Sequence, residues 1–302
     1  METKRAQIFV LTTVIFGLLY AMLGYDWQQL PKQHLDEVDV SVDNPVKSMK
    51  NADTVERPES NRPPNMESYL QFLHPEILQC EDIFELGLHK SELQYIWDNL
   101  TEYESIVEQQ KAKMSQQESA KCHEGYSAKE DGEAFIMAKL AALGFVKTIC
   151  ETGFNAGHSA LIWLLANPDA KVYSFDLGRH TCTRPMAEYL QRRFPGRLNL
   201  ELGDSTKTLP DFRRRNPDVK CDLMIVDGGH TVEVASADFD NFYAMSNRLH
   251  IVFYDNHPDI YKIGASWEKL KRRGQLTEYF RCQYVEKGFY KKHGFTFGQY
   301  IH

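Results

Sequence analysis

The sequence predicts an α/β fold with a largely parallel sheet covered by helices on both faces. From residue 129 onward, short apolar runs of strand length alternate with runs of helical period, and this alternation is typical of such sheets. The most informative stretch, residues 149–178, reads strand, glycine turn, helix, strand and then an acid. That order matches the first half of a nucleotide-binding α/β unit.

Each element follows from the periodicity of its segment. Segment 91–115, for example, carries Leu93, Ile96, Trp97 and Leu100 at helical spacing. The expected helices are 66–79, 91–115, 129–145, 157–167, 183–194, a short helix after residue 204, 231–247 and 259–273. The expected strands are 147–151, 171–176, 198–202, 221–226, 249–254 and a terminal hairpin, 278–286 and 294–301, that turns near His293 and Gly294.

The glycine turn indicates which ligand the fold would take. Its pattern is E-x-G-x-x-x-G, from Glu151 through Gly153 to Gly157, whereas a dinucleotide site needs G-x-G-x-x-G for close approach to a pyrophosphate. A helix N-terminus still offers free N–H groups and a partial positive charge, which suit one carboxylate. Asp176 stands where an acid would grip a ribose diol. The pattern favours S-adenosylmethionine over an ordinary glycine turn of another α/β domain.

Oxygen-bearing side chains stand where the fourth and fifth strands should end. Asp227 closes the fourth strand, and Asp255 and Asn256 close the fifth. Carboxyl ends of neighbouring strands converge in open α/β sheets, and two carboxylates with one amide oxygen suit Mg²⁺ or Mn²⁺. The alternative interpretation is a set of strand-end caps and turn formers.

A histidine follows the first of these acids at a short spacing. His230 lies three residues after Asp227, so it can face an oxygen of the acceptor and take its proton at neutral pH. The alternative is a capping or surface histidine. His257, which precedes Pro258, is the second candidate for the base.

Together these segments resemble the class I S-adenosylmethionine-dependent methyltransferases, over roughly residues 120–301. The GHSAL segment is similar to the G-Y-S-A-L/V of catechol-type, metal-dependent O-methyltransferases, and Asp227-Gly228-Gly229-His230 follows the D-G-x-H of the macrolide-sugar enzymes. The resemblance implies a Rossmann-like, seven-stranded sheet in the order 3-2-1-4-5-7-6, with the last strand antiparallel.

The resemblance also implies roles for individual residues. Residues 125–127 resemble the family's lid segment, and Asp204 would approach the adenine unless it is only a helix N-cap. His230 would be the general base, and the metal ligands would be Asp227, Asp255 and Asn256. The residues expected to bind the cofactor are Glu151, Gly153, Gly157, Ser159, Asp176, Asp204, Ser205 and Asp227.

The N-terminal part predicts a membrane anchor and a stem. Residues 8–23 are apolar and uncharged, with Lys4 and Arg5 before them, so a short uncleaved span with its body in the lumen is expected; a cleaved signal peptide is the competing interpretation. The predicted organisation is a cytoplasmic tip and signal anchor, a flexible stem, a helical cap and the Rossmann-like core, at residues 1–25, 26–65, 66–128 and 129–302.

The composition and the cysteines indicate which partners and which cellular compartment to expect. The net charge of −7 without a basic stripe argues against a nucleic-acid partner. We expect buried thiols at Cys150 and Cys221, and pairing in an oxidising lumen among the other cysteines. Asn99-Leu100-Thr101 is a glycosylation sequon if the chain is lumenal. The other four cysteines are Cys80, Cys122, Cys182 and Cys282.

These observations predict a single-pass type II protein of the Golgi or endoplasmic reticulum membrane. Its lumenal body would be a metal-dependent O-methyltransferase that acts on a hydroxylated acceptor, with a glycan favoured by analogy of the anchor and stem. The alternatives are a cytoplasmic-face methyltransferase for a catechol or sugar-containing metabolite, and a catalytically silent binding subunit with the same fold. The acceptor's identity and the oligomeric state stay open.

Overall fold

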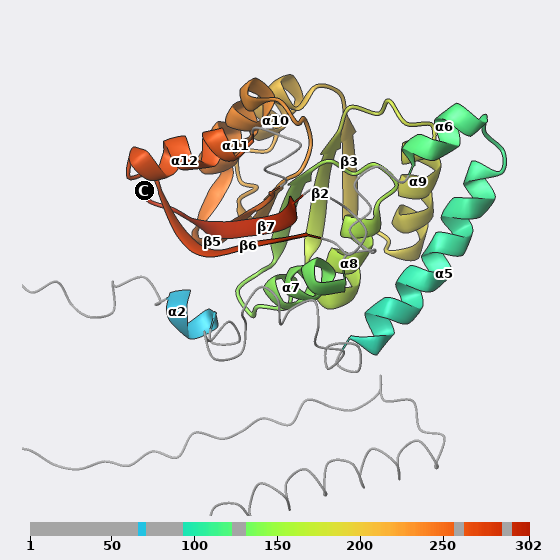
Figure 1. Ribbon diagram of the computed structural model, residues 1–302, viewed down its shortest axis with the longest axis horizontal. Coiled ribbons are helices and arrows are strands. Elements are labelled where there is room, and N and C mark those ends of the chain that lie inside the picture. The colour runs from blue at the N-terminus through green and yellow to red at the C-terminus, as the bar shows by residue number, and fades with distance from the viewer. Residues whose placement is uncertain (1–65, 71–92, 123–130, 257–262, 286–291) are drawn as a thin grey trace, which may run out of the picture. The chain divides into compact units, whose positions relative to one another are not determined.

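A seven-stranded mixed sheet forms the centre of the described chain. The computed structural model describes residues 66–70, 93–122, 131–256, 263–285 and 292–302. The strands lie in the order β3-β2-β1-β4-β5-β7-β6 (Figure 1). β7 pairs antiparallel with both β5 and β6, so the predicted order and the predicted antiparallel last strand are confirmed. The strands are β1 (Thr148–Thr152), β2 (Lys171–Asp176), β3 (Leu198–Leu202), β4 (Cys221–Val226), β5 (Ser246–Asp255), β6 (Leu276–Val285) and β7 (Lys292–Tyr300).

The terminal hairpin turns earlier in the chain than predicted, because β6 ends at Val285 and β7 already begins at Lys292. His293 and Gly294 lie inside β7, where they pair with residues of β6, and not in the turn. A Cβ at Gly294 would lie 2.0 Å from the carbonyl oxygen of Cys282. This glycine therefore serves the close approach of two strands, which the sequence pattern does not distinguish from a turn signal.

The helices of the described residues agree with the predicted pattern, apart from one division near the N-terminus; residues 71–79 of the first expected helix lie outside the described residues. The expected helix 91–115 ends at Lys111, and a second helix begins after Ser115. Ser115 and Glu118 form a reciprocal capping box, which starts a new helix at that point. The helices are α2 (Met66–Tyr69), α5 (Gln94–Lys111), α6 (Gln116–Lys121), α7 (Asp131–Ala141), α8 (His158–Ala166), α9 (Thr183–Arg193), α10 (Ser205–Arg215), α11 (Val232–Met245) and α12 (Gly264–Arg272).

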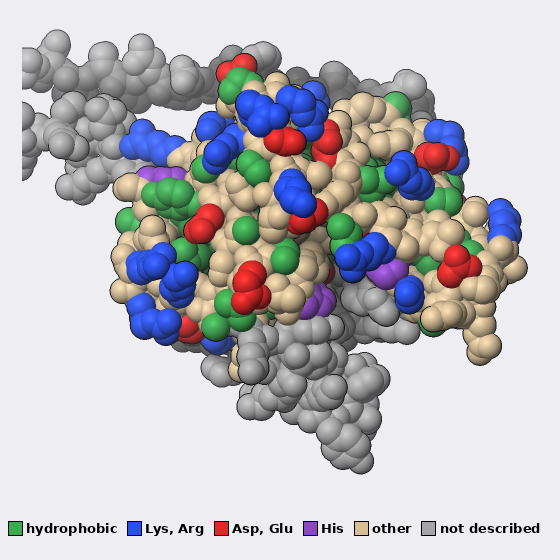
Figure 2. Space-filling view, turned by 90° about the horizontal axis from the view of Figure 1, so that it is seen from above, with side chains coloured by type: hydrophobic (Ala, Val, Ile, Leu, Met, Phe, Trp, Pro, Cys, Tyr) green, Lys and Arg blue, Asp and Glu red, His purple; other side chains and the backbone are tan. Residues whose placement is uncertain are grey.

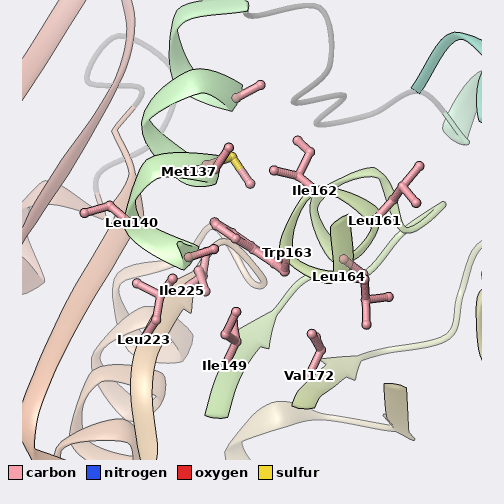
Figure 3. Close-up of a cluster of buried hydrophobic side chains, with 14 of the residues drawn as sticks. Met137, Leu140, Ile149, Leu161, Ile162, Trp163, Leu164, Val172, Leu223 and Ile225 are labelled. Carbon is pink, nitrogen blue, oxygen red and sulfur yellow. The ribbon is translucent and has the colours of Figure 1, made fainter. Parts of the chain in front are cut away.

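Helices cover both faces of the sheet. α10, α11 and α12 lie on one face, and α7, α8 and α9 lie on the other (Figure 1). Alternate residues of each strand point to opposite faces, so the strands supply two separate apolar layers. Figure 3 shows the layer beneath α7, α8 and α9, where Trp163 of α8 lies among side chains of α7, β1 and β4.

One disulfide replaces both of the expected buried thiols. Cys150 of β1 and Cys221 of β4 are bonded, with Cα atoms 5.9 Å apart, so the prediction of buried thiols there was wrong. β1 and β4 are neighbours in the sheet, and the 5.9 Å separation lies within the usual Cα distance of a disulfide. A second disulfide joins Cys122 to Cys182, and Cys282 is also disulfide-bonded.

The sequon at Asn99 does not offer a glycan acceptor in the folded chain. Asn99 lies inside α5 and is only 8% exposed. Its amide nitrogen donates to the Tyr95 carbonyl, and its amide oxygen accepts from Arg193. Both polar atoms of the side chain are therefore engaged within the protein, which argues against glycosylation at this position.

No helix of the described residues is both long and apolar enough to cross a membrane. The predicted anchor (8–23) and stem (26–65) lie outside the described residues, so both stay predictions.

Two groups of basic residues lie at helix ends. Arg213, Arg214 and Arg215 occupy the last turn of α10, and Lys271 and Arg272 occupy the last turn of α12. Positive charge there complements the helix dipole. On the face shown in Figure 2, lysines and arginines lie in small groups with acidic side chains among them. The charges on that face therefore form no single positive field.

Candidate functional site

The glycine loop after β1 is pressed against the end of β4. Gly153 has φ +95° and Gly157 has φ +80°, both in the region that favours glycine. A Cβ at Gly153 would lie 2.0 Å from the carbonyl oxygen of Asp227. Gly157 is the N-cap of α8 and has no side chain to cap its N–H groups. The loop thus places a helix N-terminus beside the end of β4. The free N–H groups of such an N-terminus can bind a carboxylate.

The Gly153→Ala variant should lose binding of S-adenosylhomocysteine. The new methyl group cannot coexist with the Asp227 carbonyl, so the loop must shift. Gly196→Ala is the matched control, because Gly196 also has positive φ (+74°) but has open space around it. That control should lose only about 1 kcal/mol of stability from backbone strain. Calorimetry on folded variants checks this, and equal affinity in both would contradict the loop assignment.

Asp176 holds the glycine loop in place. Its Oδ2 accepts the N–H groups of Phe154 and Asn155, each at 2.9 Å, and its Oδ1 accepts that of Gly178 at 2.6 Å. The structure thus assigns this carboxylate a bracing role that the sequence did not indicate. Each oxygen can accept a further hydrogen bond, so the predicted ribose contact stays a prediction.

Glu151 lies beneath the loop in a buried hydrogen-bond network. Its carboxylate accepts from Ser159 at 2.9 Å, from the Trp163 indole at 2.7 Å and from Ser174 at 2.6 Å. Burial raises the pKa of Glu151 to about 7, while these hydrogen bonds oppose the shift. The structure joins Glu151 to Ser159, which is also expected to bind the cofactor, and to Trp163 and Ser174, which the sequence gave no reason to include. Contact of Glu151 and Ser159 with the cofactor stays a prediction.

Asp204 is the N-cap of α10. Its Oδ1 accepts from the backbone N–H of Thr206 at 3.1 Å and from the Thr206 hydroxyl at 2.7 Å. The hydrogen bond from Thr206 lowers the pKa of Asp204. The capping interpretation is confirmed, and the adenine contact of Asp204 and Ser205 stays a prediction.

Asp227, His230 and Asp255 meet at the same edge. Thr152, Val226 and Tyr254 lie side by side on three adjacent parallel strands, and Asp227 and Asp255 are the residues that follow the last two. One ligand atom from each of Asp227, His230 and Asp255 lies within 4.8 Å of the other two. His230 Nε2 lies 3.5 Å from Asp227 Oδ1. The predicted acids and the predicted base are therefore brought together.

The amide of Asn256 is oriented by β7. Its Nδ2 donates to the Thr296 hydroxyl at 3.1 Å, and its backbone N–H donates to the Gly294 carbonyl at 2.7 Å. The side chain is 3% exposed. The antiparallel strand therefore fixes the direction of this amide, and nothing in the sequence pattern pointed to Thr296.

Asp238 is a buried acid that the sequence analysis missed. It lies on α11 and is 0% exposed. The hydroxyls of Ser205 and Thr152 approach its carboxyl group, but neither makes a hydrogen bond of ordinary geometry with it. Burial raises the pKa of Asp238 to about 6. Its place on the apolar face, between Ala235 and Phe242 at helical spacing, is the signal that could have found it.

Asp238→Asn should stabilise the protein at alkaline pH. Because the folded pKa of about 6 lies above the ordinary 3.8, the stability that the neutral acid contributes below about pH 4 is lost as pH rises through about 6. The gain from asparagine should reach about 3 kcal/mol near pH 8 and shrink toward zero near pH 4. Thermal unfolding across this range checks it, with Asp240→Asn, exposed on the same helix, as control. A gain independent of pH would contradict the assignment.

Two predicted features fall outside the described residues. They are His257, the second candidate for the base, and the lid segment at residues 125–127.

Comparisons with known proteins agree with this architecture. Residues 150–257 match a family model described as a methyltransferase domain. An inferred O-methyltransferase from Klebsiella pneumoniae is 15% identical and has a TM-score of 0.52, over 72% of this chain and 97% of its own. This likeness shows the fold. No curated protein sequence matches the chain significantly.

Two further solved structures are more distant in shape. TomG of Streptomyces achromogenes, an O-methyltransferase of tomaymycin synthesis in complex with SAM, is 21% identical over 56% of this chain and 80% of its own, with a TM-score of 0.48. The N-methyltransferase NodS of Bradyrhizobium japonicum is 13% identical over 62% and 98%, with a TM-score of 0.48. Residues 150–257 therefore match the model of a methyltransferase domain, and the described chain shares the fold of the Klebsiella pneumoniae protein.

Proposed function

We propose that this chain transfers a methyl group from S-adenosylmethionine to a hydroxyl oxygen and needs a divalent cation. One observation carries the proposal: the glycine loop and the acidic cluster share a single edge of the sheet. A Cβ at Gly153 would lie 2.0 Å from the Asp227 carbonyl oxygen, and Asp227 belongs to the cluster with His230 and Asp255. A donor bound at the loop would thus have its methyl group beside the acceptor site.

The residues around the loop suit an adenosine with an amino-acid tail. The α8 N-terminus at Gly157 has N–H groups for a carboxylate, and Ser159 and Glu151 lie beside it. Asp176 would meet the ribose, and Asp204 and Ser205 would lie by the adenine. The cofactor therefore spans the carboxyl ends of β1, β2 and β3 in this proposal, as ligands of open α/β sheets do.

The acidic cluster has the donors that a hard divalent cation prefers. Asp227 and Asp255 supply carboxylates, and Asn256 would supply its amide oxygen, since its amide nitrogen is engaged by Thr296. Such oxygen sets favour Mg²⁺ or Mn²⁺. A cation held there would stabilise negative charge on the acceptor oxygen and orient a vicinal diol.

His230 would act as the general base. Its ring would take the proton of the acceptor hydroxyl while the oxygen attacks the methyl carbon in line. The new O–CH₃ bond forms as the S–CH₃ bond breaks, and the bonding pair returns to sulfur, leaving S-adenosylhomocysteine. Positioning of the two reactants by the shared edge supplies much of the acceleration, and the base adds about 10²–10⁴-fold.

We further propose a lumenal location and a glycan acceptor. The apolar segment 8–23 and the polar stem resemble the architecture of Golgi glycan-modifying enzymes. The Cys150–Cys221 and Cys122–Cys182 disulfides suit an oxidising compartment. Protease protection in sealed microsomes tests this part: digestion of the body without detergent would contradict it.

Transfer of labelled methyl to a panel of glycans and catechols tests the activity. Label in glycan O-methyl groups, abolished by chelator, is the expected result. Label in catechols alone would favour a small-molecule methyltransferase. Binding of S-adenosylhomocysteine without any transfer would favour a catalytically silent subunit.

A further inference from the structure

Helices α5 and α6 meet the glycine loop from outside the sheet, and the proposed function gives them no role. α5 packs against α8, and α5 and α6 run beside α9 (Figure 1). They belong to the segment that precedes the methyltransferase domain match at residues 150–257. Besides the apolar side chains that α5 adds to the core, the two helices make polar contacts with Asn155, Ala156 and His158, in the loop and at the start of α8.

Tyr103 of α5 makes the most buried of these contacts. Its side chain is 0% exposed, and its hydroxyl donates to the carbonyl of Ala156 at 2.7 Å. Burial raises the pKa of Tyr103 well above its ordinary value, so the hydroxyl keeps its proton and stays a donor. Ala156 lies between Gly157 and Asn155 and is itself 0% exposed. Without Tyr103 its carbonyl would be buried and unpaired.

Two neighbouring residues are held by the same segment. Asn155, at φ +46°, donates through Nδ2 to the Lys121 carbonyl of α6 at 3.3 Å. This positive φ is uncommon for a residue other than glycine, so external support is expected there. His158, the first residue of α8, lies with Nε2 3.0 Å from Glu104 Oε2 of α5.

A disulfide closes this arrangement covalently. Cys122, at the end of α6, is bonded to Cys182, at the start of α9. Cys182 Sγ lies 3.9 Å from Asn155 Oδ1. The disulfide therefore fixes the end of α6 next to Asn155, the loop residue other than glycine that has a positive φ.

We propose that α5 and α6 form a latch that sets the affinity for the methyl donor, with Tyr103 and the Cys122–Cys182 disulfide as its positioning groups. The proposal rests on the proposed function, because residues 153–157 must be the cofactor loop. A loop held in its binding conformation avoids the cost of ordering on binding. When the latch is loosened, only a fraction of molecules is competent, and the apparent affinity falls by that fraction.

Tyr103→Phe in the full chain tests the latch. It removes one hydroxyl and keeps the ring, so the affinity for S-adenosylhomocysteine should fall about tenfold. The matched control is Tyr300→Phe, because the Tyr300 hydroxyl is also buried and donates to a backbone carbonyl, that of Phe239 on the opposite layer, at 3.0 Å. Both variants lose a comparable hydrogen bond, but only Tyr103→Phe should lower the affinity.

The double variant Cys122→Ser/Cys182→Ser is the second test. It should raise the KM for the methyl donor severalfold at nearly constant kcat, because the reacting groups are untouched. Equal, unchanged affinity in Tyr103→Phe and Tyr300→Phe, or an unaltered KM in the double variant, would overturn the latch. A wild-type chain that does not bind S-adenosylhomocysteine would overturn the proposed function and the latch together, so the two failures are distinguishable.

Discussion

Replacing His230 with glutamine should lower the turnover of methyl transfer by about 10²–10⁴-fold. Glutamine keeps a polar side chain of similar reach but cannot accept the acceptor's proton. His230 Nε2 lies 3.5 Å from Asp227 Oδ1, so the histidine stands within the acidic cluster. Single-turnover kinetics with labelled donor measures the loss, and calorimetry should show unchanged binding of S-adenosylhomocysteine.

The same variant separates two roles for this histidine. One of its nitrogens belongs to the group of ligand atoms within 4.8 Å, so it has the position of a base and also that of a ligand. If turnover falls while cation affinity holds, His230 is the base; if both fall together, it is a ligand. His302→Gln, at the C-terminal end beside Ser246, is the control. Near-full turnover in His230→Gln would move the search to His257.

The sheet and the acidic cluster could be predicted because both depend on local pattern. β2, β3 and β4 occupy the predicted residues, since short apolar runs bounded by turn residues fix a strand within narrow limits. The end of a strand also determines where in the sheet the next residue lies. Once β4 and β5 are neighbours in parallel, Asp227 and Asp255 must meet at one edge, whatever the packing elsewhere.

Contacts between distant segments could not be predicted in this way. Tyr103 meets Ala156 across 53 residues, and Asn256 meets Thr296 across 40, and no periodicity encodes such pairs. The Cys150–Cys221 bond joins β1 and β4 across 71 residues, and the two apolar runs do not specify that these strands are neighbours. In the same way, the position of Asp176 after the second strand suggests contact with a ribose. Only the structure shows that its carboxylate accepts the loop's N–H groups.

Asp255→Asn should abolish the response of activity to divalent cations. The change keeps the shape of a side chain that is 9% exposed but removes one of the two carboxylates that the cluster would offer a cation. Loss of a charged ligand should weaken cation binding. A bound cation would stabilise the charge of the transition state by several kcal/mol, so its loss should lower turnover at least about 10²-fold. Binding of S-adenosylhomocysteine should persist, because the cofactor loop follows β1 and is braced by β2.

The control for this variant lies at the other end of the same sheet. Asp222 in β4 is 5% exposed, and its Oδ2 accepts the N–H groups of Lys147 and Thr148 at 2.8 and 2.9 Å. Asp222→Asn makes the same chemical change far from the cluster, so it should cost stability but leave the cation titration intact. Activity of the wild type should vanish in excess chelator and return on adding Mg²⁺ or Mn²⁺. Full activity in chelator, or an Asp255→Asn variant that titrates like wild type, would show that these acids only shape the turns after β4 and β5.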